Sequence, residues 1–170
     1  ALGSNIGASR VDEGNVLKAY EIIKTANKRQ VNIILPSDVV SSAEMSPSAS
    51  WRVSSINKLR VDEAGFDIGP QTSLNFELVL STANTIIWNG PMGVCEIPSF
   101  STGTQSIASI VRKRTEDGAI SIIGGGDTVS ALKNNGIDDG FTHISTGGGA
   151  SLRLLSGKEL PSFDALKIYE

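Results

Sequence analysis

The sequence is poor in cysteine, histidine and aromatic residues, and it has no long apolar run. Its only cysteine, Cys95, cannot form an internal disulfide, which fits a reducing compartment. With one cysteine and one histidine, His143, neither a zinc site nor a Cys–His dyad is expected. We predict instead that Cys95 is a small packing residue and that His143 is packed and hydrogen-bonded in a strand. No apolar run reaches the length of a membrane span, so no membrane partner is expected.

Basic residues are not in excess either. The formal net charge is −3 and no stripe of lysine or arginine is present, which argues against nucleic-acid binding. A chain of 170 residues with 39% hydrophobic and 19% charged residues is typical of a folded domain with a real core. We therefore expect one domain over residues 1–170. An anionic ligand would be attracted by local dipoles and not by the overall charge.

Short apolar runs alternate with stretches of helical periodicity along the chain. Strand-like runs that end in a glycine-rich or polar turn are expected at 31–38, 85–93, 119–128 and 142–151. Helices are expected at 14–29, 70–82, 98–114, 128–135 and 149–156. This alternation indicates βαβ units and an α/β fold, with helices on both sides of a parallel sheet. Residues 37–69 are predicted to be irregular, with one or two short strands near 51–53 and 64–68, and the tail 157–170 mostly irregular.

Two glycine triplets follow successive predicted strands. In a parallel sheet the carboxyl ends of the strands lie at one edge, where ligands bind. Backbone N–H groups at helix starts favour an anion, and we expect this anion to be phosphate. Asp127, after the first triplet, either caps its helix or holds a divalent cation on a bound polyphosphate. The triplets are Gly124, Gly125 and Gly126, and Gly147, Gly148 and Gly149.

Two further stretches have both a structural and a functional interpretation. After the strand at 85–88, Asn89 can donate to a phosphate oxygen and Glu96 can accept from ribose hydroxyls. The alternative is a Gly-Pro turn with a solvated glutamate. Gly65 and Phe66 can offer backbone and an apolar surface to an adenine ring, or they can belong to a plain turn before Pro70.

Two common phosphate-binding signatures are absent. The dinucleotide fingerprint G-x-G-x-x-G would need glycine where Val129 and Leu152 stand. The P-loop pattern would need glycine at Leu152 and serine or threonine at Glu159. An NAD-dependent oxidoreductase is therefore disfavoured, and a phosphate-binding α/β domain of another type is expected.

The motifs LPSDVV, FDIGP, WNGPMGVCE, IIGGGDT and HISTGGGASLRLLSGKELP, in this order, resemble the C-terminal domain of phosphoglycerate kinase. The resemblance runs nearly end to end and implies a partial Rossmann-like domain that binds ADP or ATP with Mg²⁺. It also implies transfer of a phosphoryl group between 1,3-bisphosphoglycerate and ADP, giving ATP and 3-phosphoglycerate in glycolysis. The phosphoglycerate would bind to a second domain that this chain does not contain.

The resemblance also implies roles for single residues. Gly65, Phe66 and Val94 would line the adenine pocket. Glu96 would hold the ribose, and Asp127 would hold the metal–nucleotide complex. The phosphate path would be shaped or contacted by Asn89, Pro91, Gly93, Thr128, Gly124, Gly125, Gly147 and Gly148, while Gly126 and Gly149 would face the transferred group.

Several features depart from the family pattern. The lysine-bearing glycine-alanine segment that contacts phosphates in the family is missing, and Phe66 stands where leucine is usual. We therefore expect a fragment that is inactive as a kinase alone, with bare sheet edges, exposed apolar surface and marginal stability. A catalytically inactive nucleotide-binding module is the alternative. A monomer is expected in the cytoplasm, with a plastid as the alternative location.

Overall fold

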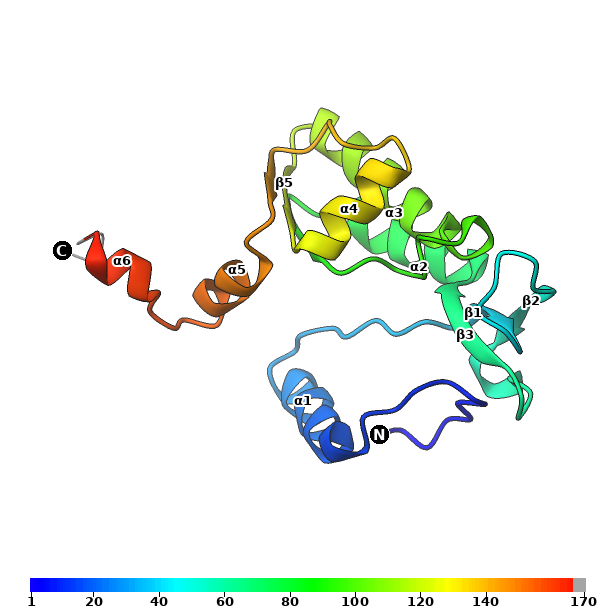
Figure 1. The fold of residues 1–170 in the computed structure, drawn as a ribbon. Coiled ribbons are helices and arrows are strands. Elements are labelled where there is room, and N and C mark those ends of the chain that lie inside the picture. Colours follow the sequence, from blue (N-terminus) through cyan, green and yellow to red (C-terminus); the bar gives the residue numbers. More distant parts are fainter. Residues whose placement is uncertain (167–170) are drawn as a thin grey trace. The chain divides into compact units, whose positions relative to one another are not determined.

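The computed structural model describes residues 1–166 and divides the chain into two compact units. Unit 1 comprises Ala1–Val79 and Met92–Ile107, and unit 2 comprises Leu80–Pro91 and Ala108–Glu170. The division falls inside two helices, α2 (Pro70–Leu80) and α3 (Thr102–Glu116). Each unit has a sheet of its own (Figure 1). No helix in the described part of the chain is both long and apolar enough to span a bilayer.

Unit 1 contains a three-stranded antiparallel sheet in the order β2-β1-β3. The predicted strands near 51–53 and 64–68 are confirmed as β2 and β3, and the predicted helix at 14–29 is confirmed as α1. The central strand β1 was not foreseen. The regular elements of unit 1, apart from parts of α2 and α3, are η1 (Glu13–Asn15), α1 (Val16–Lys28), β1 (Asp38–Ser42), β2 (Trp51–Ser55), η2 (Ile56–Lys58), β3 (Ala64–Ile68) and η3 (Pro98–Phe100).

The strand predicted at 31–38 is wrong for most of its length. Residues 31–36 form no strand, and β1 begins only at Asp38. A strand needs a neighbour to pair with, and this run has no ladder partner in the described part of the chain. Its apolar side chains are accordingly exposed, from 40% for Ile34 to 56% for Val31. This is part of the uncovered apolar surface that the sequence predicts.

The core of unit 1 is built around Phe100, which is fully buried next to Val40 and Ile97. Phe66 and Val94 pack against this cluster while staying partly accessible. The rings of Phe66 and Phe100 have centroids 5.1 Å apart in a tilted arrangement, a favourable geometry for an aromatic pair. Phenylalanine at position 66, where the family usually has leucine, therefore keeps an apolar surface that is packed against the core.

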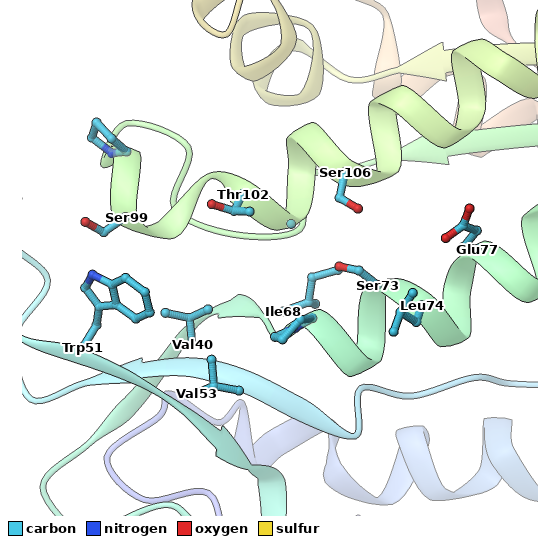
Figure 2. A pocket seen from close by; sticks show the side chains of 13 residues that line it. Val40, Trp51, Val53, Ile68, Ser73, Leu74, Glu77, Ser99, Thr102 and Ser106 are labelled. Carbon is cyan, nitrogen blue, oxygen red and sulfur yellow. The ribbon is translucent and has the colours of Figure 1, made fainter.

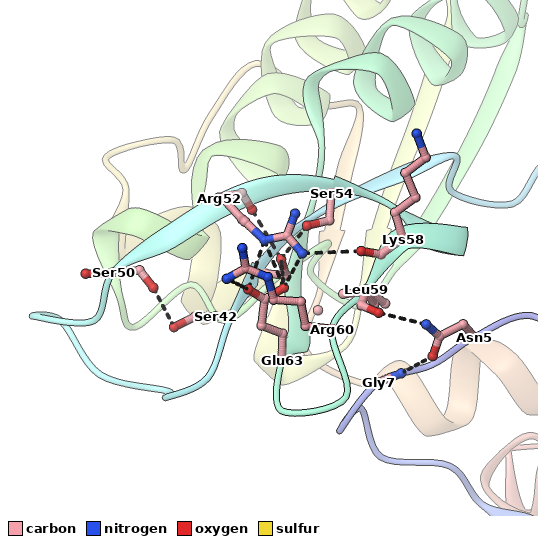
Figure 3. A network of polar contacts seen from close by, with 12 residues as sticks. Asn5, Gly7, Ser42, Ser50, Arg52, Ser54, Lys58, Leu59, Arg60 and Glu63 are labelled. Carbon is pink, nitrogen blue, oxygen red and sulfur yellow. Dashed lines mark hydrogen bonds and ion pairs between the residues drawn. The ribbon is translucent and has the colours of Figure 1, made fainter.

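A buried carboxylate, Glu63, ties the hairpin of β1 and β2 to the loop before β3 (Figure 3). The Arg52 guanidinium donates to both carboxylate oxygens, with its closest contact at 2.6 Å, and the Ser41 hydroxyl donates at 3.2 Å. Hydrogen bonding from Arg52 is the main reason that the pKa of Glu63 falls to about 2. Arg60 lies further away, at 3.6 Å, and is mostly exposed.

We expect Glu63→Gln to lower the melting temperature of the chain at pH 7. The pKa of Glu63 is lower in the folded chain than its ordinary value of 4.5, so its stabilisation is present above pH 4.5 and is lost as the pH falls through about 2. The difference in melting temperature between wild type and variant should therefore shrink over that range. Arg60→Gln is the control and should change little, because the Arg60 side chain is mostly exposed and lies 3.6 Å from the carboxylate. A pH-independent difference for Glu63→Gln would contradict this prediction.

Unit 2 contains a three-stranded parallel sheet in the order β4-β5-β6, as the alternation of apolar runs and helices predicts. The helices at 70–82 and 98–114 are confirmed as α2 and α3, the second of which follows η3. The regular elements of unit 2, apart from parts of α2 and α3, are β4 (Thr85–Asn89), β5 (Ile120–Gly124), α4 (Gly126–Asn134), β6 (His143–Ser145), α5 (Gly148–Leu155) and α6 (Pro161–Ala165).

One face of the parallel sheet is buried and the other is partly open. Ile86, Trp88 and Ile123 are at most 5% exposed, whereas Ile87 and Ile120 are about half exposed. Ala108 and Val111 of α3 are fully buried as well. β4 is an edge strand in the described part of the chain, so the expected bare edge is present.

Three local expectations are corrected by the structure. His143 is exposed and not packed, because it is the first residue of β6, an edge strand in the described part of the chain. The helix predicted from residue 128 begins two residues earlier, at Gly126. The tail is not mostly irregular as far as it is described, because Pro161–Ala165 form α6; residues 167–170 lie outside the described part. Cys95 is a buried packing residue, as predicted.

Candidate functional site

The two glycine triplets lie side by side at the same end of the parallel sheet. β5 and β6 are hydrogen-bonded neighbours that run in the same direction, so the turns that follow them leave the sheet at one edge. The Gly125 N–H donates to the Ser145 carbonyl over 3.1 Å, which joins the two turns directly. A Cβ added to Gly148 would lie only 2.5 Å from the Cα of Gly125. Only glycine permits this approach of the two backbones.

The helices that begin at these turns present free N–H groups. In α4 the first intrahelical bond runs from the Val129 N–H to the Gly125 carbonyl, and in α5 it runs from Ser151 to Gly147. The preceding amides therefore have no acceptor within their helices. Together with the helix dipoles, they form a surface suited to anions. These amides belong to Gly126, Asp127 and Thr128 in α4 and to Gly148, Gly149 and Ala150 in α5.

Asn89, the last residue of β4, lies beside both turns. Its carboxamide nitrogen would be 3.3 Å from a Cβ at Gly124 and 3.2 Å from one at Gly148. The side chain is exposed, so its amide N–H groups are available to a ligand at this edge. Pro91 follows in the next turn and is partly buried. Gly126 and Gly149, by contrast, have open space in front of their backbones.

Thr128 connects α4 to the turn after β4. Its side chain is fully buried, and its hydroxyl accepts a 2.7 Å hydrogen bond from the Gly90 N–H. The Trp88 indole donates to the carbonyl of the same glycine, whose φ is +99°. The hydroxyl of Thr128 is thus engaged in holding this turn. Its backbone N–H has no acceptor within α4, and the sequence resemblance did not distinguish this amide from the hydroxyl.

Asp127 is the second residue of α4 and is exposed. The residue before the helix is Gly125, and no side chain caps the helix start, so the capping interpretation of Asp127 is wrong. No cluster of three or more histidine, cysteine or acidic side chains is found in the described part of the chain. A single carboxylate next to an anion surface fits Mg²⁺, which keeps several waters and shares oxygens of bound phosphates.

The other predicted site residues belong to unit 1 and lie together there. The Val94 N–H donates to the Phe66 carbonyl over 2.9 Å, so the two residues form a common, half-buried apolar surface. Gly65 precedes Phe66 in β3, and a side chain there would press on Val39. Glu96 is exposed two residues after Val94. Gly93 lies before Val94 and packs directly on Asp67.

Asp67 is a buried carboxylate next to Gly93 that sequence reasoning missed. It is buried, and its carboxylate accepts hydrogen bonds from the Gly103 N–H at 2.7 Å and the Ile68 N–H at 2.8 Å. Burial is the main reason that its pKa rises to about 6. Neither Gly93 nor Gly103 leaves room for a Cβ beside this carboxylate. The signal in the sequence is an aspartate within an apolar strand, FDI.

Comparisons with known proteins agree with this geometry. A sequence profile described as "Phosphoglycerate kinase" matches residues 1–158. Among curated relatives, the phosphoglycerate kinase of Dictyoglomus turgidum is 45% identical over 167 residues, and that of Chlorobium phaeobacteroides is 43% identical over 166. Each alignment covers 98% of this chain but 42% of the relative. The chain thus spans well under half the length of these relatives.

Two solved structures that match this chain are also phosphoglycerate kinases. The phosphoglycerate kinase of Coxiella burnetii matches with a TM-score of 0.87 and 40% identity, over 92% of this chain and 40% of that one. The enzyme of Pyrococcus horikoshii matches with a TM-score of 0.74 and 31% identity, over 91% of this chain and 36% of that one. The extent of the profile match, which leaves out only the last residues, decides the assignment: this chain belongs to the phosphoglycerate kinase family.

Proposed function

We propose that this chain is the nucleotide-binding part of a phosphoglycerate kinase, which transfers a phosphoryl group between 1,3-bisphosphoglycerate and ADP. The observation that carries the proposal is the pair of helix starts on neighbouring parallel strands, with amides that have no intrahelical acceptor. Phosphoryl transfer requires reactants to be positioned and negative charge to be neutralised, and little covalent work from the protein. An array of fixed N–H groups is suited to this task.

In unit 2, the amides of Gly126, Thr128, Gly148 and Gly149 would donate to phosphate oxygens, with Asn89 adding its side-chain N–H groups. Asp127 would hold Mg²⁺, an ion that neutralises phosphate charge when bound. The open space before Gly126 and Gly149 would leave room for the transferred group. Gly124, Gly125 and Gly147 would shape the turns, and Pro91 would fix the chain after β4.

In unit 1, Gly65, Phe66 and Val94 would contact the adenine ring, because they offer an apolar surface with accessible backbone. Glu96 would accept hydrogen bonds from the ribose hydroxyls. Gly93 would keep this turn close to Asp67. The bacterial relatives support a cytoplasmic protein. We further propose that it acts as a monomer and that 3-phosphoglycerate or 1,3-bisphosphoglycerate is the second reactant.

Calorimetric titration with MgADP tests the proposal. We expect saturable binding by the chain, and a loss of affinity of about tenfold in Asp127→Asn, which corresponds to about 1.4 kcal/mol. The matched control is Asp138→Asn, which changes another exposed aspartate of unit 2 and should leave the affinity unchanged. With magnesium removed by a chelator, wild type and Asp127→Asn should bind ADP equally. Equal MgADP affinity of the two proteins would refute the metal role, and no binding at all would refute the nucleotide site.

A further inference from the structure

Unit 1 contains a pocket that none of the proposed nucleotide-binding residues lines. Its volume is about 740 Å³, within the range of about 300–1,000 Å³ that is usual for small-molecule sites (Figure 2). The pocket lies between the small antiparallel sheet and the first turns of α2 and α3. Phe66, Val94 and Glu96 are not among its lining residues. It is therefore separate from the surface to which we assign the adenine ring.

One half of the pocket is apolar. Val40 of β1 and Val53 of β2 form its floor, and the indole of Trp51 closes this end (Figure 2). Trp51 is 52% exposed although it is the largest side chain of the sheet. An indole face in this position can stack on a ring and can also attract a cation. Trp88, the other tryptophan, is buried in unit 2.

The other half of the pocket is polar. Ser73 and Glu77 lie one helical turn apart on α2, and Thr102 and Ser106 lie one turn apart on α3. Within the described residues, none of these side chains has a hydrogen-bond or ion-pair partner. Among the described residues that line the pocket, Glu77 alone is charged. The positive end of the α3 dipole is already balanced by the Asp67 carboxylate, which accepts a hydrogen bond from the Gly103 N–H.

We propose that this pocket binds a primary organic amine with an aromatic body. The ammonium group has three donors, which match the Glu77 carboxylate and the hydroxyl oxygens of Ser73 and Ser106. The aromatic body lies on Val40 and Val53 and against Trp51. An anionic ligand is disfavoured, because the Glu77 carboxylate, the one charge among the described lining residues, is negative. A purely apolar ligand would make no use of the carboxylate and the hydroxyls.

The test uses 2-phenylethylamine as the probe and heteronuclear NMR of the whole chain as the readout. The two indole N–H signals distinguish the pocket from the rest of the protein, because Trp51 lines it and the Trp88 indole donates to the Gly90 carbonyl. We expect saturable shifts of the Trp51 signal, with millimolar affinity, and an unchanged Trp88 signal. The neutral analogue 2-phenylethanol should bind about fivefold more weakly.

Two variants identify the groups involved. Glu77→Gln keeps the size of an exposed side chain and should weaken the amine about fivefold while leaving 2-phenylethanol unaffected. Glu44→Gln, at an exposed position of the same unit, is the control and should change neither ligand. Equal affinity for the two probes, equal binding of the amine by Glu77→Gln, or shifts that are confined to Trp88 would each overturn the proposal.

Discussion

Gly148→Ala is expected to destabilise the folded chain by about 1–3 kcal/mol, the usual cost of overpacking a close contact. The new methyl group would lie 2.5 Å from the Gly125 Cα and 2.8 Å from its nitrogen. These are backbone atoms, so no side chain can rotate away to make room. The turns after β5 and β6 would have to move apart, which lengthens the hydrogen bond between Gly125 and Ser145. Chemical denaturation of the two proteins measures the difference.

Gly149→Ala is the matched control for stability, since it introduces the same methyl group one residue later in α5. A Cβ at Gly149 would meet nothing within 4 Å, and alanine favours a helix over glycine by about 1 kcal/mol. Its stability should equal or exceed that of wild type. If Gly148→Ala were as stable as Gly149→Ala, the two turns could not be packed together as described.

The second large effect is a pH-dependent loss of stability caused by Asp67. Burial raises the pKa of this carboxyl from its ordinary value of 3.8 to about 6 in the folded chain. A raised pKa means that the folded chain binds the proton more tightly than the unfolded chain does. The stabilisation is complete below pH 3.8 and is lost as the pH rises through about 6. At about 1.4 kcal/mol per pH unit this amounts to at most about 3 kcal/mol, and solvent screening reduces it toward 2 kcal/mol.

Asp67→Asn should remove this dependence on pH. We expect the free energy of unfolding of wild type, relative to that of the variant, to fall by about 2–3 kcal/mol between pH 4 and pH 7. Asp62→Asn removes an exposed carboxyl five residues earlier and should leave the profile of wild type unchanged. A constant difference between wild type and Asp67→Asn across this range would show that the carboxyl titrates normally.

The parts of the fold that local sequence decides were predictable. Glycine triplets after apolar runs marked the turns of β5 and β6, and the shared edge followed from the rules of parallel sheets. The run at 31–36 has the same composition as a buried strand, but pairing depends on a neighbour that a local pattern cannot reveal. β1 was not predicted because its serines are not typical of a buried strand. In the fold it nevertheless pairs with both β2 and β3.

Within the candidate site, the residue types were predictable, but the partners of their side chains were not. Thr128 was expected to contact phosphate, yet its hydroxyl is engaged by the Gly90 N–H, 38 residues earlier in the sequence. Asp67 was missed because its partner, Gly103, is 36 residues away. Such contacts depend on how distant segments pack. The neighbouring sequence marks Asp67 only as an aspartate within an apolar strand and does not reveal its partner.

The anion surface of unit 2 consists mainly of peptide groups, which every amino acid except proline supplies. Ordinary substitutions along the starts of α4 and α5 cannot delete these donors; they can only displace them. Natural selection at most positions of these helix starts should therefore act on shape more than on functional groups, with small residues retained; Asn89 and Asp127, whose side chains we propose to contact the ligand, are the exceptions. A homologue could diverge widely in composition while its ligand experiences the same set of main-chain donors.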